Sequence, residues 1–410
     1  MTWTTLNETS YAGQIQIVVS TPVDWQINEQ IVISTTSYIA TETEIFMIVN
    51  ISSDRQTITL NSNLLYDHLC FVQDSVAISA AVGLLSRNVR VIGSEYPGQD
   101  SDMYGFTILV AGYSKYDNVN DLILNYMGYT RLSNVEFSHP GQFSRGIQAK
   151  SPFGIMYSYI GSYNSIRPTY VKSCSFHHGY STAIGILGSA SLPIENNVFY
   201  KTLDYSIYLE GNSNIIRNNL ITMNYWASSF IIGEAPFDNT YPGAIDAHNA
   251  DSAVIENNFI AGAERAGLFY KGDACPGNSV GWSHSIKNNT IHAALAGVVI
   301  LPSYSFGQLW CVLISNFTVY KSSHWGIYYQ GYQSLIADSN ILIENQVNIF
   351  TIVFGPESLY HYTSNKNVQI SNSLIVGRTN SFDCDRDMKP NDLNYQQATT
   401  IRAFGAGINI

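Results

Sequence analysis

A six-residue pattern that recurs along the chain limits the possible folds more than any other feature of the sequence. In each copy the first and sixth residues are apolar and the third is polar, as in IENNVF at 194–199. Successive copies begin 22 to 39 residues apart, and self-similarity at such a period indicates a solenoid. The copies occupy residues 132–137, 171–176, 194–199, 216–221, 255–260, 286–291, 314–319, 336–341 and 370–375.

The third residue of each copy is nearly always Asn. Asn tolerates the left-handed backbone of a tight bend. Its amide can also hydrogen-bond to its counterpart in the next coil, at the roughly 4.8 Å spacing of paired strands. We therefore predict a stacked, buried ladder of amides at this position. Its members would be Asn134, Asn196, Asn218, Asn257, Asn288, Asn316 and Asn372, with Ser173 and Asp338 in the remaining copies.

A second element follows most copies of the pattern. It has a small residue, often Gly, and then alternating apolar residues, as in AIGIL at 183–187 and WGIYY at 325–329. This is typical of a strand that follows a bend. A shortest repeat of 22 residues suits three short strands per coil, and the longer intervals are coils that carry loops. We predict an all-β chain with a right-handed parallel β-helix over 125–379, because parallel crossovers are usually right-handed.

The chain on either side of the predicted helix has a different character. Residues 1–92 contain alternating strand runs, which predict a small all-β domain that caps the helix and protects its open end. Residues 93–124 are expected to be a connecting loop region, and residues 380–410 an irregular C-terminal segment.

The composition excludes several classes of protein. A hydrophobic content of 45% with 12% charged residues excludes a disordered chain, and a net charge of −11 argues against a nucleic-acid partner. No run approaches 18 apolar residues, so this segment is not expected to insert into a membrane. We expect neither a metal nor a cofactor, because zinc-type cysteine pairs, HExxH, P-loop and dinucleotide motifs do not occur.

Two of the five cysteines have a predicted partner. Cys275 and Cys311 fall near successive coils, and the 36 residues between them are easily bridged. We predict a disulfide between them, and therefore an oxidising compartment. Partners for Cys70, Cys174 and Cys384 stay open.

Four N-glycosylation sequons occur in the chain. Asn288 and Asn316 lie in the predicted buried ladder, so glycosylation is not expected there. Asn7 and Asn50 are the preferred glycan acceptors.

Several segments resemble a known family. TWTTLNETSYAGQIQIVVSTPVDWQINEQIVISTTSY at 2–38 is similar to the second half of a glycine-eight domain, and RNVRVIG at 87–93 resembles its end. Segments similar to fibrocystin and fibrocystin-like proteins are GYTRLSNVEFSHPGQ at 128–142, ERAGLFYKGDACPG at 264–277, HWGIYYQ at 324–330 and NVQISNSLIVG at 367–377.

The resemblance runs in order from about residue 2 to 387. It implies a large extracellular, receptor-like glycoprotein with parallel β-helix repeats, of a family with some members on cilia. More distant relatives include hyaluronan-degrading proteins of the cell surface. The first half of the glycine-eight domain does not occur, so we expect a piece of a longer protein or a divergent short member.

Aligning the second strands by their small residues predicts one outward-facing surface. One column holds Tyr208, Asp246, Phe269, Val299 and Tyr328, and the column two residues further on holds Glu210, His248, Lys271, Leu301 and Gln330. Carboxylates beside aromatic rings could form a saccharide site. Glu210, Asp246, His248 and Lys271 are then weak catalytic candidates, and Tyr208, Phe269 and Tyr328 are candidates to stack on a ligand. The alternative is an ordinary solvated face.

Three functions remain open. The favoured one is a non-catalytic scaffold or adhesion module at the cell surface or on cilia, which binds a glycan or a protein. The second is a hydrolase or lyase of a hyaluronan-like polysaccharide. The 20 Lys and Arg residues are not clustered, which suits a polyanionic substrate poorly. The third is a structural subunit of a larger assembly.

Overall fold

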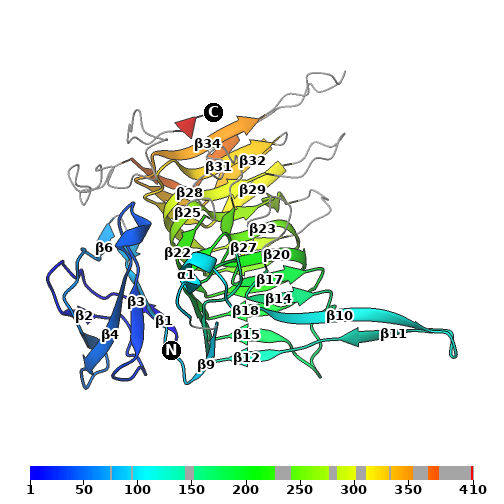
Figure 1. Cartoon of the computed structure of the whole chain (residues 1–410). Helices are drawn as coiled ribbons and strands as arrows, with labels where there is room; N and C mark the ends of the chain where they lie inside the picture. Colours follow the sequence, from blue (N-terminus) through cyan, green and yellow to red (C-terminus); the bar gives the residue numbers. More distant parts are fainter. Residues whose placement is uncertain are drawn as a thin grey trace.

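A small antiparallel β domain and a long parallel β-helix make up the described chain (Figure 1). The computed structural model describes residues 1–73, 76–93, 96–143, 152–226, 242–276, 284–301, 311–331, 334–353, 368–377 and 408–409. The N-terminal domain lies beside the stack of coils, along several of them.

The N-terminal domain is built on a six-stranded antiparallel sheet in the order β1-β8-β3-β4-β5-β2. Alternating apolar residues such as Ile31 and Phe46 point into its core, which surrounds the fully buried Trp25. Its elements are β1 (Trp3–Thr5), β2 (Gln16–Val18), β3 (Gln30–Ile33), η1 (Ala40–Glu42), β4 (Glu44–Ile51), β5 (Thr57–Leu60), the hairpin β6 (Cys70–Gln73) and β7 (Val76–Ser79), and β8 (Ala81–Leu84).

The β-helix has three faces, each a stack of parallel strands. The first face precedes the bend of each six-residue copy. Its strands are β12 (Arg131–Ser133), β15 (Tyr170–Lys172), β18 (Pro193–Glu195), β21 (Ile215–Arg217), β24 (Val254–Glu256) and β27 (Ser285–Lys287), then β29 (Cys311–Ser315), β32 (Ser334–Asp338) and β35 (Val368–Ser371). The short β26 (Asp273–Ala274) pairs antiparallel with β29.

The second face follows the bend. It contains β9 (Val89–Ile92), β13 (Val135–Ser138), β16 (Ser175–His177), β19 (Val198–Leu203), β22 (Leu220–Tyr225), β25 (Phe259–Tyr270), β28 (Thr290–Ile300), β30 (Thr318–Tyr320), β33 (Ile341–Ile343) and β36 (Leu374–Val376). Strands β25 and β28 continue into the third face. Its other strands are β10 (Ile108–Asp117), β14 (Ile155–Ser158), β17 (Ile184–Leu187), β20 (Ile207–Asn212), β23 (Gly243–Asp251), β31 (Trp325–Gly331), β34 (Val347–Val353) and β37 (Ile408–Asn409).

The helix begins earlier than the sequence predicts. Strand β9 already pairs in parallel with β13, and the expected loop region 93–124 contains α1 (Gln99–Asp102), β10 and the start of β11 (Leu122–Met127). The first residues of β10 pair with β14, and Gly112–Asp117 then pair with β11 in a hairpin that projects from the body (Figure 1). The sequence pattern misses this coil because no six-residue copy marks it. Of the segment 380–410, only β37 lies within the described residues.

The third residue of each copy forms the predicted left-handed bend. Its φ angle lies between 48° for Asn372 and 59° for Asn316. The exception is the copy predicted at 336–341, where Ser339 rather than Asp338 takes the left-handed position, with φ of 55°. The register explains the difference, because Ile314 pairs with Ala337 and the copy therefore starts one residue later.

The buried amide ladder lies one residue beyond the predicted position. Asn134, Asn196, Asn257, Asn288, Asn316 and Asn372 are exposed and Asn218 is half-buried, so the third-position prediction of a buried ladder is wrong. A left-handed residue turns its side chain outward, and the next residue then points inward. The ladder consists of Asn197, Asn219, Asn258 and Asn289, in which each Nδ2 donates to the next Oδ1 at 3.0 Å.

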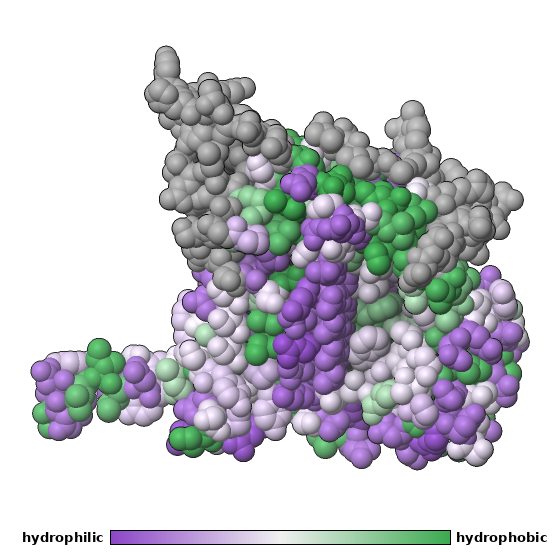
Figure 2. Space-filling model, turned by 180° about the vertical axis from the view of Figure 1, so that it is seen from behind, coloured by the Kyte–Doolittle hydropathy of each residue, from purple (hydrophilic) through white to green (hydrophobic). Residues whose placement is uncertain are grey.

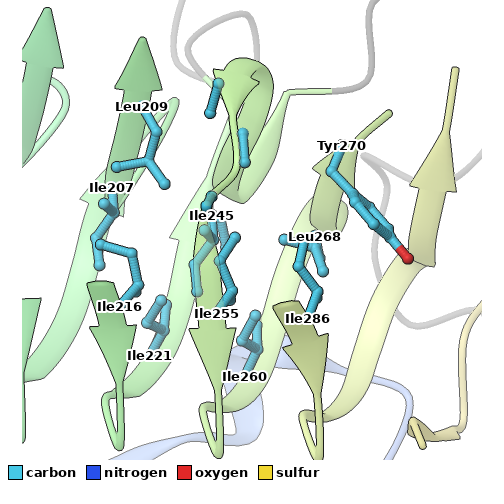
Figure 3. Close-up of a cluster of buried hydrophobic side chains, with 14 of the residues drawn as sticks. Ile207, Leu209, Ile216, Ile221, Ile245, Ile255, Ile260, Leu268, Tyr270 and Ile286 are labelled. Carbon is cyan, nitrogen blue, oxygen red and sulfur yellow. The ribbon is translucent and has the colours of Figure 1, made fainter. Parts of the chain in front are cut away.

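Stacks of like side chains fill the interior of the helix. Ile207, Ile216, Ile245 and Ile255 illustrate the aliphatic part of this core (Figure 3). Near the first coils the rings of Phe137, Phe176 and Phe199 stack with centroid separations of 4.7 and 5.0 Å. Burial of such stacks is the main favourable contribution to the stability of the coil array.

The N-terminal domain docks on the second face. Val32 and Ala81 contact Val198 and Leu220 there. The close approach requires Gly83, since a Cβ on this residue would lie 2.7 Å from Leu220 Cδ2. The two parts are therefore held as one folded unit by an apolar contact.

Polar bonds also cross this contact. Trp3 Nε1 donates to the carbonyl oxygen of Asn218 at 2.8 Å. The Nε2 of buried His292 lies 2.8 Å from the carbonyl oxygen of Thr35.

Candidate functional site

The predicted outward column on the third face exists in the structure. Tyr208 pairs with Asp246, Asp246 with Phe269, Phe269 with Val299, and Val299 with Tyr328. The column continues to Phe350 on β34. The small residues that precede each strand therefore predict the register of this face correctly.

The second predicted column is broken by an irregularity between β20 and β23. The register shifts between Tyr208 and Glu210, so that Glu210 pairs with Asn249 and not with His248. One extra residue in β23 produces this bulge, and no sequence pattern marks it. The prediction that Glu210 lies opposite His248 is therefore wrong.

Asp246 is the buried carboxylic acid of the column. Its side chain is only 4% exposed, and its Oδ1 accepts a hydrogen bond from the backbone N–H of His248 at 3.1 Å. Burial raises the pKa of Asp246 to about 7, although backbone N–H groups of His248 and Gly243 oppose this shift. The carboxyl can therefore hold a proton near neutral pH.

The basic candidates interact with other groups than the predicted carboxylates. Lys271 Nζ lies 3.0 Å from Asp251 Oδ1. The ring of His248 stacks on Phe269 at 4.5 Å. Burial and the nearby Lys271 cation lower the pKa of His248, which favours the neutral imidazole.

The aromatic candidates are more buried than an outward-facing column suggests. Tyr208 and Tyr328 are each 8% exposed, and only Phe269 is half-buried. Tyr208 contacts the ring of Phe153 and its hydroxyl accepts a hydrogen bond from Asn249 Nδ2 at 3.0 Å. Neighbours within the sheet therefore cover much of the ring surface, which sequence alternation alone does not reveal.

Aromatic rings contact one another directly at the C-terminal end of the column. Tyr328 stacks on Phe350 with centroids 5.6 Å apart, and the ring of Trp325 lies 4.7 Å from Tyr328. Trp325 and Phe350 are half-buried. Tyr328 donates its hydroxyl hydrogen to Gln330 Oε1 at 2.7 Å.

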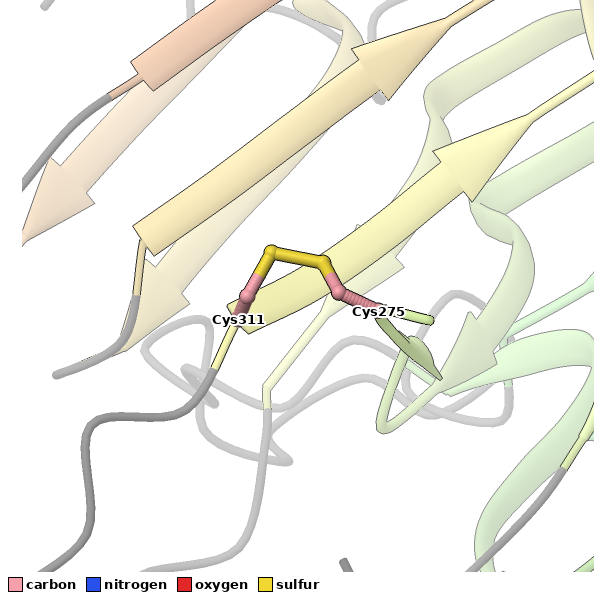
Figure 4. The surroundings of a disulfide bond; sticks show 2 residues. All are labelled: Cys275 and Cys311. Carbon is pink, nitrogen blue, oxygen red and sulfur yellow. A yellow bond between two sulfur atoms is a disulfide. The ribbon is translucent and has the colours of Figure 1, made fainter. Parts of the chain in front are cut away.

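The structure contains the disulfide between Cys275 and Cys311, whose Cα atoms are 5.4 Å apart (Figure 4). It joins the end of β26 to the start of β29. Cys70 is half-buried and Cys174 buried, both as free thiols, and Cys384 lies outside the described residues.

A buried polar cluster near this disulfide escaped the sequence analysis. Burial raises the pKa of Asp273 to about 7 and lowers the pKa of His284 to about 4. Tyr270, whose ring lies 6.1 Å from that of His284, is fully buried. The only sequence signal is an acid two residues before Cys275.

A ladder of alternating charge runs along the first face. Lys172 Nζ lies 2.9 Å from Glu195 Oε2, and Arg217 Nη2 lies 3.1 Å from Glu256 Oε2. The links from Glu195 to Arg217 and from Glu256 to Lys287 measure 3.7 and 3.5 Å. These residues occupy the second position of consecutive copies.

The accessibility of the sequons differs from the prediction in one respect. Asn7 and Asn50 are exposed. Asn288 and Asn316 are exposed as well, because they occupy the outward bends rather than the buried ladder. The sequence argument against glycosylation at these two sites is therefore wrong.

No helix in the described ranges is both long enough and apolar enough to span a membrane.

Two overlapping segments, residues 115–260 and 160–309, match the family model described as a right handed beta helix region. The fold is a right-handed parallel β-helix, as predicted.

Three relatives show how much of the chain is matched by other proteins. Fibrocystin-L of Homo sapiens is 33% identical over 408 residues, which cover 98% of this chain and 9% of that protein. Fibrocystin of Canis lupus familiaris is 26% identical over 401 residues, 96% of this chain and 9% of that protein. The cell surface hyaluronidase of Danio rerio is 25% identical over 206 residues, 48% of this chain and 14% of that protein.

The chain thus spans only 9% of the length of the fibrocystin relatives. These similarities confirm the predicted resemblance to the fibrocystin proteins.

Proposed function

We propose, from the similarity of this right-handed β-helix to one segment of fibrocystin-L and fibrocystin along nearly its whole length, that the chain is a recognition module outside the cell. The disulfide supports this location, because disulfides persist in oxidising compartments. The relative from Danio rerio is also named as a protein of the cell surface. The exposed Asn7 and Asn50 would carry N-glycans there.

The observation that carries the proposal is the group of aromatic side chains along the column of the third face. Phe269, Trp325 and Phe350 keep part of their rings accessible, and Tyr328 joins the last two. Aromatic rings bind sugar faces or protein side chains without any tuned ionisation. We therefore place a glycan or protein ligand on this column.

The polar residues beside the column suit binding better than catalysis. Glu210 is displaced from His248 by the bulge, and the Lys271 cation faces Asp251. A lyase acting on a uronic acid polymer would need cations around its substrate, and this face offers Lys271 alone among the candidates.

To test the proposal, the chain is incubated with a panel of glycans and proteins, and both ligand binding and product release are measured. Phe269→Ala should weaken binding about tenfold, which corresponds to the loss of about 1.4 kcal/mol of contact. Lys287→Ala, an exposed residue on the first face, serves as the control and should leave binding unchanged. Binding that is equal in both variants, or ligand shortened by the wild-type chain, would contradict a non-catalytic role for the column.

Asp246 favours a second candidate, an enzyme that degrades a polysaccharide. A pKa of about 7 is suited to a general acid at neutral pH. The similarity to a protein named as a hyaluronidase adds to this alternative. Product release from hyaluronan by the wild-type chain, abolished in Asp246→Asn but kept in Lys271→Gln, would establish it in place of the binding role.

A further inference from the structure

A groove of about 910 Å³ lies between the N-terminal domain and the first bends of the β-helix. Trp3, Gln26 and Arg87 line one side. The other side consists of the left-handed residues of four consecutive coils, from Asn134 to Asn218. This volume falls in the range of sites that hold small ligands, and junctions between domains are common places for them.

The helix side of the groove presents amides in a regular row. Asn134 and Asn196 are exposed and Asn218 is half-buried. Within the described part of the chain, the side-chain amides of Asn196 and Asn218 have no hydrogen-bond partner. Each amide offers a donor and an acceptor, and consecutive coils repeat them at roughly 4.8 Å. Figure 2 shows a hydrophilic stripe along the body, consistent with the bend residues and the charge ladder of the first face.

The backbone N–H groups of these bends are already used within the β-helix. The N–H groups of Asn134, Asn196 and Asn218 already donate to carbonyl oxygens of the following coil, at 3.1 to 3.2 Å. An extended peptide that adds to a sheet needs free backbone groups. The free hydrogen-bond donors on the helix side of this groove are therefore side-chain amides, which suits the hydroxyl groups of a sugar better than a peptide that adds to a sheet.

The charges of the groove indicate which sugars it accepts. Its cations are Arg87 and the N-terminal ammonium of Met1, which lies 2.6 Å from Asp24 Oδ1. Arg87 donates from Nε to the Ser173 carbonyl and from Nη1 to the carbonyls of Leu84 and Ser86. The carboxylates of Asp24 and Glu29 also line it. The groove thus has no excess of positive charge, which excludes a polyanionic glycan as the preferred ligand.

We propose that this groove binds an uncharged linear oligosaccharide, whose hydroxyl groups hydrogen-bond to the amides of Asn196 and Asn218 on adjacent coils. The site is formed by first-face bends and the N-terminal domain. It is therefore separate from the third-face column of Phe269, and it goes beyond the function proposed above.

Titration calorimetry of the full chain with short manno-, cello- and chito-oligosaccharides tests the site, with a hyaluronan fragment as the charged control ligand. Asn196→Gly and Asn218→Gly remove the amides but keep the bend, because Gly accepts positive φ. Each should weaken binding of the uncharged ligand about tenfold. Asn257→Gly is the matched control, since Asn257 has the same left-handed bend as both residues and the same exposure as Asn196 but lies outside the groove.

The same titrations separate this site from the aromatic column. Binding that Phe269→Ala abolishes and the groove variants leave intact would overturn the groove and support the column. Weaker binding in Asn196→Gly and Asn218→Gly, with binding unchanged in Asn257→Gly, supports the groove whether or not Phe269→Ala also changes binding. No measurable binding of any uncharged oligosaccharide, equal loss in Asn257→Gly, or tighter binding of the hyaluronan fragment would each refute the proposal.

Discussion

Asn219 Nδ2 donates to Asn258 Oδ1 at 3.0 Å, and Asn219 Oδ1 accepts an equivalent hydrogen bond from Asn197 Nδ2, also at 3.0 Å. The amide of Asn219 also serves the backbone, since its Nδ2 donates to the Ile194 carbonyl and its Oδ1 accepts from the Asn197 N–H. One fully buried side chain thus satisfies polar groups of three coils. Such a network stabilises the stack only while every member is present.

We expect Asn219→Ala to lower the free energy of unfolding by about 3 kcal/mol or more, because buried donors and acceptors in two coils lose their partners. Asn218→Ala, one residue earlier, should cost only about 1 kcal/mol, the strain of Ala in a left-handed bend. Urea denaturation of the two variants gives the comparison. Equal losses would mean that the ladder contributes no more than the bend.

Removing the disulfide should destabilise the chain by about 4 kcal/mol, the chain-entropy value for the 36-residue separation of Cys275 and Cys311. The double variant Cys275→Ser, Cys311→Ser and the reduced wild type should unfold at similar denaturant concentrations. Cys174→Ser, which alters a buried free thiol, is the comparison for simple loss of a sulfur atom. A reducing agent that leaves the wild-type midpoint unchanged would count against this prediction.

Asp246 should make the protein less stable as the pH rises. Burial raises its pKa in the folded state to about 7, while the unfolded carboxyl ionises near 3.8. The unfolded chain therefore loses its proton first, and stability falls between about pH 4 and pH 7. Asp246→Asn should remove this fall, with a gain over the wild type of up to about 4 kcal/mol at pH 8 relative to pH 4. Parallel stability curves of variant and wild type would contradict it.

His292 should act in the opposite direction. Burial lowers its pKa to about 3, with the Lys321 cation contributing, while the unfolded imidazole titrates near 6.5. Its contribution to stability is complete above pH 6.5 and is lost as the pH falls towards 3, by up to about 1.4 kcal/mol per pH unit. His292→Gln keeps a donor for the Thr35 carbonyl and should flatten this acid limb in denaturation curves. An unchanged slope would show that His292 does not titrate on unfolding.

The repeat pattern predicts much of the fold because each copy encodes one bend. Left-handed Asn residues and the strand order follow from it, as does the column from Tyr208 to Tyr328. The position of the ladder does not follow, because IENNVF contains two adjacent Asn residues and either could face inward. The buried one, Asn197, breaks the usual rule that polar residues point outward.

The remaining site features depend on contacts between distant segments. The bulge beside Glu210 reflects one residue in β23 that no spacing reveals. The burial of Tyr208 depends on Phe153 in another coil. The groove at Asn196 exists only because the N-terminal domain docks beside it, a contact that no pattern within one coil encodes.

Charge alternates from coil to coil along Lys172, Glu195, Arg217, Glu256 and Lys287. Whether opposite charges still face each other after coils are lost therefore depends on whether an even or an odd number is lost. Loss of the single coil that carries Arg217 would bring Glu195 against Glu256, and like charges would face each other on the first face. Loss of two neighbouring coils restores opposite neighbours, so Lys172 would meet Glu256. We therefore expect this stretch of the β-helix to tolerate the gain or loss of two coils better than that of one. Each surface ion pair contributes little by itself, but together they disfavour a change by an odd number of coils.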